Sequence, residues 1–86
     1  MPEISRFYGI IIRMYPGDHP PPHFHAVYAE HEAFIEIATG NILYGHVPGT
    51  ALQLVRTWMQ QHEGELEKLW DLAMQSRPLH KIAPLD

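Results

Sequence analysis

Three of the seven histidines of this chain lie within one stretch of eight residues, Asp18 to His25. Three consecutive prolines precede His23. Because proline fixes φ near about −65°, this segment should be a stiff, extended arm that leads into a strand. His23 and His25 are separated by one residue, so on a strand both imidazoles lie on one face and Phe24 lies on the other. Imidazoles bind metal ions and transfer protons near neutral pH, so this pair could form a chemical site.

Metal binding is the first chemistry that the histidine pair could support. His23 and His25 offer two imidazole ligands, which suit zinc, nickel or copper, but a site needs three or four converging ligands. No cofactor is expected and no metal ligand is assigned. A divalent metal could nevertheless bind through His23, His25 and His19, and Asp18, His46 or Glu36 could complete such a site.

Cleavage of RNA without a metal is the second chemistry. His23 and His25 could act as general base and general acid, while Arg13 holds the phosphate and stabilises its developing charge. Arg13 would lie beside the histidines if its strand pairs with theirs. The residues expected to bind a ligand at the same site are Asp18, His19, Phe24 and Tyr15. The formal net charge of −4 argues against this chemistry, because it gives no steering toward RNA.

A purely structural role is the third reading of the motif. The proline arm and the histidines could hold a crossing loop through hydrogen bonds to backbone carbonyls. The protein would then be a non-catalytic interaction or regulatory module that binds a partner through a sheet face or edge. We expect an unusually apolar sheet face away from the helices, which favours a homodimer or a partner that covers it. Its apolar residues would be Phe7, Ile11, Val27 and Phe34.

The motif must be positioned by the surrounding secondary structure. The sequence predicts strands in the first half of the chain and helices in the second half. Apolar, β-branched and alternating segments predict four strands, joined by short turns into a β-meander over about residues 7–47. The expected strands are 7–15, 23–28, 32–38 and 42–47. In the first of them, the core face should carry Tyr8, Ile10, Ile12 and Met14.

Apolar residues then recur at helical spacing over residues 50–76. One straight helix of that length would be about 40 Å long and would overhang strands of about 20–24 Å. We therefore expect two helices with a break near residues 61–64, and an extended tail over 79–85 that forms a short edge strand. The predicted fold is a single α+β domain, residues 1–86, with a four-stranded, mostly antiparallel β-meander packed on two C-terminal helices in two layers.

Composition narrows the class of protein. The chain has 86 residues, of which 45% are hydrophobic and 19% charged, as in a folded globular domain. An acidic balance argues against a general nucleic-acid coat, although nucleic-acid binding stays open. There is no cysteine, no basic leader followed by an apolar core, and no apolar run long enough to span a membrane. We expect a cytoplasmic protein without a membrane partner.

Four segments carry a resemblance to a known family. They are the start Met-Pro-x-Ile-Ser-Arg-Phe-Tyr-Gly-Ile, the stretch Asp18-His19-x-Pro-Pro-His23-Phe24-His25, the Trp58-x-x-x-His62-x-x-Glu65-Leu66-x-x-x-Trp70 spacing, and the closing Ile82-x-Pro84-Leu85. Together they resemble the bacterial family called domain of unknown function 4160, some of whose members are labelled DhiT-like toxins of type II toxin–antitoxin pairs. The resemblance implies that the protein is a toxin-like component that acts through protein contacts, with a cognate small antitoxin-like protein as its partner. The His23/His25 site is a second feature through which such a toxin could act.

Overall fold

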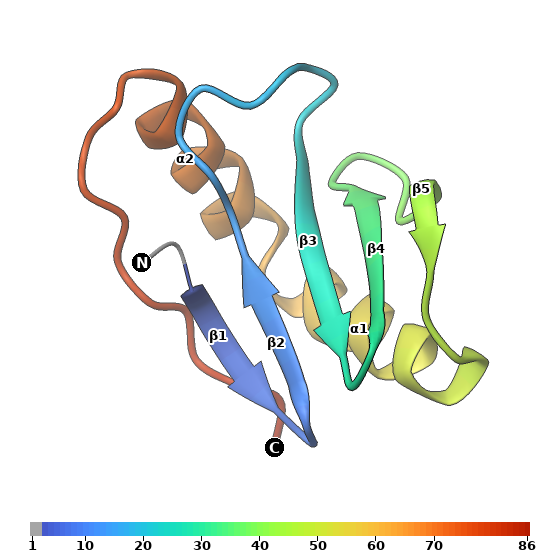
Figure 1. The fold of residues 1–86 in the computed structure, drawn as a ribbon. Helices are drawn as coiled ribbons and strands as arrows, with labels where there is room; N and C mark the ends of the chain where they lie inside the picture. The colour runs from blue at the N-terminus through green and yellow to red at the C-terminus, as the bar shows by residue number, and fades with distance from the viewer. Residues whose placement is uncertain (1–2) are drawn as a thin grey trace.

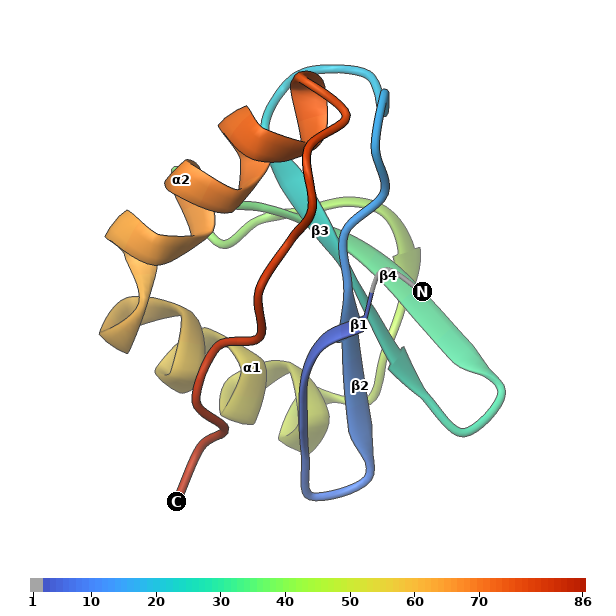
Figure 2. The same cartoon turned by 90° about the vertical axis from the view of Figure 1, so that its left-hand side faces the viewer.

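The computed structural model describes residues 3–86, so the first two residues of the predicted domain lie outside the described range. Within these described residues, five strands form one antiparallel sheet in the order β1-β2-β3-β4-β5, and two helices follow them. Both helices cover the same face of the sheet (Figures 1 and 2). This architecture confirms the predicted α+β meander, with five strands where four were predicted. The elements are β1 Glu3–Phe7, β2 Ile10–Arg13, β3 His23–Tyr28, β4 His31–Glu36, β5 Ile42–His46, α1 Gly49–Gln61 and α2 Glu63–Met74.

The extra strand arises because the segment predicted as one strand, residues 7–15, contains a hairpin turn. Tyr8 and Gly9 both have positive φ, 50° and 79°, which is the signature of a tight two-residue turn, and Phe7 pairs with Ile10 across it. A tyrosine rarely adopts this conformation, so the sequence pattern did not reveal the turn. Two predictions were therefore wrong: Tyr8 is 60% exposed instead of buried, and Phe7 is in the core instead of on the outer face.

The core lies between the inner face of the sheet and the helices, and Trp58 of α1 is its largest completely buried side chain. Its ring centroid is 5.4 Å from that of Phe7 and 5.8 Å from that of Phe24. The Trp58 Nε1–H donates a hydrogen bond of 2.8 Å to the carbonyl of Ala83, which ties the C-terminal tail to the core. Trp58 therefore joins the hairpin, the central strand and the tail.

The predicted break between two helices is confirmed at His62. This residue lies between α1 and α2 with φ −135° and ψ 25°, and its Nδ1 is 2.8 Å from Oε1 of Glu65. The chain changes direction there, so that each helix packs across the sheet (Figure 2). Neither helix in the described residues is long and apolar enough to cross a membrane.

The tail after α2 runs beside β1 at the edge of the sheet (Figure 1). Its backbone is tied to that strand by a 2.7 Å hydrogen bond from the Ile82 N–H to the Ile4 carbonyl. Within the described residues the tail forms no regular strand, so the predicted C-terminal edge strand was wrong. Pro84 has no N–H with which to extend such a ladder.

Candidate functional site

The histidine motif lies where the proline-rich loop enters β3, on the outer face of the sheet. His25 is opposite Arg13 of β2 and Phe34 of β4, and His23 is opposite Glu36. Side chains alternate along a strand, so the two imidazoles share the outer face, as predicted from their spacing. Phe24 points the other way and is completely buried against Trp58.

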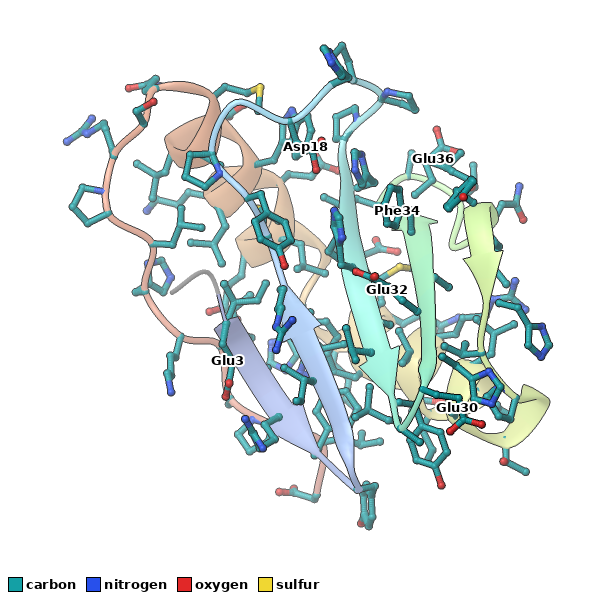
Figure 3. All side chains as sticks on the ribbon, viewed as in Figure 1. Glu3, Asp18, Glu30, Glu32, Phe34 and Glu36 are labelled. Atoms are coloured by element: carbon teal, nitrogen blue, oxygen red, sulfur yellow. The ribbon has the colours of Figure 1, made fainter. Side chains whose placement is uncertain are left out.

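A carboxylate from the loop joins the two histidines. The Asp18 Oδ2 atom is 3.1 Å from Nε2 of His23 and 3.0 Å from Nε2 of His25. On the far side of each ring, Nδ1 of His23 is 2.8 Å from the Pro21 carbonyl, and Nδ1 of His25 is 3.1 Å from Oε2 of Glu32. We call Asp18, His23, His25 and Glu32 the histidine cluster. Asp18 and Glu32 lie at its two ends (Figure 3).

The hydrogen-bonding capacity of imidazole constrains this cluster. Each of the four ring nitrogens of His23 and His25 faces an oxygen that can only accept a hydrogen bond. A neutral imidazole carries a single N–H. If Nδ1 of each ring donates to its carbonyl or carboxylate, then both Nε2 lone pairs point at the Asp18 oxygen. Three electron-pair donors then converge on one place, which a metal cation can occupy. In the alternative state each imidazole is doubly protonated, and its Nε2–H donates to Asp18.

The distances from Asp18 to the two histidines suit a metal ion. Asp18, His23 and His25 each offer one possible ligand atom, and these three atoms lie within 4.8 Å of one another. Ligands about 2.1 Å from an ion are about 3.0–3.4 Å apart for coordination angles between 90° and the tetrahedral value. The two observed nitrogen–oxygen distances, 3.0 and 3.1 Å, are within this range.

Packing holds both imidazoles in place. His23 is 5% exposed, and its ring lies between Phe34 and Trp70 of α2, with centroid distances of 5.5 and 5.3 Å. His25 is 7% exposed and contacts Phe34 at 4.0 Å and Tyr15 at 4.7 Å. Rings fixed in this way present their nitrogens in one direction, as a binding site requires.

Asp18 is held as an ionised carboxylate. Burial raises the pKa of this group, but the hydrogen bonds from His25 and from the backbone N–H of His19, together with the charges of His23 and His25, outweigh burial and lower it. The loop itself is anchored to α2 through a 3.3 Å hydrogen bond from the Gly17 N–H to the Ala73 carbonyl. Asp18 is thus presented as an anion at a fixed position.

The other candidate residues divide into two groups. Tyr15 contacts the His25 ring, and Arg13 lies opposite His25 with its Nε buried and without a hydrogen-bond partner among the described residues. The remaining residues lie outside the cluster. His19 is exposed, Phe24 is in the core, Glu36 accepts a hydrogen bond from Thr39, and His46 is on β5 beside His31.

Sequence reasoning missed two members of the site, Glu32 and Trp70. The alternation of β4 places Glu32 on the outer face with Phe34, so its face was predictable. Its hydrogen bond to His25, which lies diagonally across the two strands, depends on a register that the sequence does not show. Trp70 is part of the core, and its contact with His23 depends on where α2 crosses the end of the sheet.

Comparison with protein families gives a match that covers most of the chain. A family model described as a domain of unknown function (DUF4160) matches residues 9–71. The matched range runs from the hairpin turn into α2 and contains the whole histidine cluster together with Trp70. No curated protein and no solved structure matches the chain.

Proposed function

This chain belongs to the family described as a domain of unknown function (DUF4160), and from that premise we propose that it binds a divalent transition-metal ion, such as zinc, through Asp18, His23 and His25. The observation that carries the proposal is the convergence of Nε2 of both histidines on Oδ2 of Asp18. Two imidazoles and one carboxylate are ligands that zinc and its neighbouring divalent ions prefer.

The surroundings of the three ligands support the proposal. In protein metal sites, the ring nitrogen that does not bind the ion usually donates to a carbonyl or carboxylate, which fixes the tautomer and the orientation of the ring. Here the Pro21 carbonyl is placed to accept from His23 and the Glu32 carboxylate from His25. Three protein ligands leave further coordination positions for water, and an ion bound there would make such a water more acidic.

Metal-free acid–base cleavage of RNA has less support from the same geometry. A general acid or base needs a nitrogen within reach of the substrate. Both Nε2 atoms instead face Asp18, and both rings are more than nine-tenths buried. We therefore favour metal binding over proton transfer by His23 and His25.

Zinc added to the chelator-treated protein should raise its thermal midpoint. An ion that binds only the folded state at 100 times its dissociation constant adds about 2.7 kcal/mol of stability. Cobalt should also quench the fluorescence of Trp70, whose ring is 5.3 Å from that of His23. In a Trp70→Phe variant the remaining tryptophan is Trp58. If Trp70 is the source of the quenching, cobalt should quench the fluorescence of this variant much less than that of the wild type. Unchanged thermal midpoints with zinc, cobalt and nickel, and no heat of binding by calorimetry, would overturn the proposal.

A toxin-like role for the protein rests on the family resemblance. We propose that the chain is the toxin-like component of a toxin–antitoxin pair, that it works in the cytoplasm, and that its partner is a cognate small antitoxin-like protein. The alternative is a non-catalytic interaction or regulatory module. The metal site is compatible with either role, because a bound ion can take part in catalysis or can stabilise the packing of the proline-rich loop against the sheet.

Bacterial growth separates these roles. Induced wild-type protein is expected to arrest growth, and Asp18→Asn is expected to relieve the arrest while its circular dichroism spectrum stays unchanged. Equal arrest by both proteins would show that toxicity does not require the metal site and would favour a binding surface. If the wild type does not arrest growth at all, the toxin-like role is contradicted for this chain.

A further inference from the structure

We propose that the outer face of the sheet pairs with the same face of a second copy of this chain, in a two-fold dimer whose axis runs along β3. The helices cover only the inner face (Figure 2). The proposal rests on the pattern of apolar and charged residues across the outer face, and it does not depend on metal binding.

Two apolar pairs lie on the outer face, diagonally offset from each other. Ile11 of β2 is opposite Val27 of β3, and Phe34 of β4 is opposite Tyr44 of β5. In the next position along each row, Val27 is opposite Glu32 and Phe34 is opposite His25. Ile11, Val27 and Phe34 are partly exposed and Tyr44 is 71% exposed, and exposed apolar surface commonly contributes to protein–protein interfaces.

Opposite charges lie on the two sides of β3. Three cationic side chains, Arg6, Arg13 and Lys81, accompany Glu3 at the β1–β2 side, where Glu3 contacts Arg6 at 2.9 Å and Lys81 at 3.9 Å. The β4 side instead carries acidic side chains with no lysine or arginine on that strand or its turns, namely Glu30, Glu32 and Glu36. The face is therefore positive on one side of β3 and negative on the other.

This charge pattern selects the second copy as the partner and sets the symmetry axis. β3 is the central strand of five, so a two-fold axis along it places β2 of each copy over β4 of the other, and β1 over β5. The cationic side of each copy then faces the acidic side of its partner. A two-fold axis across the strands would instead place β2 on β2 and β4 on β4, where like charges repel. Isologous interfaces are self-complementary in this way.

Arg13 illustrates the fit. With the axis along β3, Arg13 of one copy lies above Phe34 of the other, between Glu32 and Glu36 on the same strand. The guanidinium would gain two carboxylates and an aromatic face, both of which it binds well.

A specific dimer must bury a substantial part of the surface of each chain. A standard interface takes about 800 Å² from each partner. That is roughly one-sixth of the 4981 Å² accessible surface of the chain. Two such faces pack about 10 Å apart with their strands nearly aligned.

Charge-swap variants test the dimer by sedimentation or by light scattering after gel filtration, in the presence of a chelator so that metal plays no part. At concentrations well above a micromolar dissociation constant, the wild type should have twice the 9.9 kDa mass of one chain. Arg13→Glu and Glu36→Arg should each be monomeric, and an equimolar mixture of the two should recover the dimer mass. Glu63→Arg, the same charge change on the exposed side of α2, should remain a dimer.

Two results would overturn the proposal. A monomeric wild type at these concentrations would leave the outer face to a different kind of partner. A dimer that persists in both Arg13→Glu and Glu36→Arg would place the contact elsewhere, such as the free edge of β5. Circular dichroism checks that each variant is folded, and Glu36→Arg keeps the test decisive if Arg13→Glu is unstable.

Discussion

Replacing Asp18 with asparagine is expected to weaken zinc binding by at least about 100-fold, because changes to residues that only orient a ligand already cost about 10–100-fold. The substitution keeps the size of the side chain and removes its negative charge, which supplies one of the three converging ligand atoms. The neutral amide also brings two N–H groups that repel a cation. Isothermal titration calorimetry of the metal-free protein measures the change.

A matched control is available on α2. Asp71→Asn makes the same chemical change at an exposed position that is not one of the three ligands, and it should leave zinc affinity unchanged. If Asp18→Asn binds zinc as tightly as the wild type does, Asp18 is not a ligand. If both variants lose affinity equally, the effect arises from the net charge of the chain and the proposed coordination is wrong.

The second large effect is expected for Trp58→Ala, which should lower the free energy of unfolding by about 3–5 kcal/mol. The completely buried ring packs against Phe7 and Phe24, so its removal leaves a cavity between the hairpin and α1. The variant also loses the hydrogen bond from Nε1 to the Ala83 carbonyl. Urea denaturation of the metal-free protein gives the difference directly.

Trp58→Phe separates packing from hydrogen bonding. It keeps an aromatic ring beside Phe7 and Phe24 but cannot donate to Ala83, so the expected loss is smaller, with about 1 kcal/mol due to the hydrogen bond. A loss below about 1 kcal/mol for Trp58→Ala would be far outside the range for a buried aromatic residue. It would show that Trp58 does not hold the core together as described.

Most of the fold could be predicted because its signals are local. Alternating apolar residues and short turns give an antiparallel meander, and a helical pattern too long for the sheet gives two helices, which meet at His62. The hairpin at Tyr8–Gly9 could not be predicted, because a tyrosine at positive φ is uncommon and the apolar run continues through it. This one turn reversed the expected positions of Phe7 and Tyr8.

The candidate site was predictable only in part. The spacing of His23 and His25 places both rings on one face, whatever the rest of the chain does. The third ligand depends on how the loop after β2 folds back, which local patterns do not determine. Asp18 rather than His19 is the loop residue that reaches the rings, and the backbone N–H of His19 donates to Asp18 instead.

The most direct test of the metal site is anomalous diffraction from crystals of the zinc-loaded protein, recorded at the zinc absorption edge. The proposal predicts an anomalous peak about 2.0–2.2 Å from Nε2 of His23, Nε2 of His25 and an oxygen of Asp18. Data from Asp18→Asn crystals grown in the same way should lack that peak. A zinc-loaded crystal with no peak at these three residues, or with zinc bound only elsewhere, would contradict the central claim.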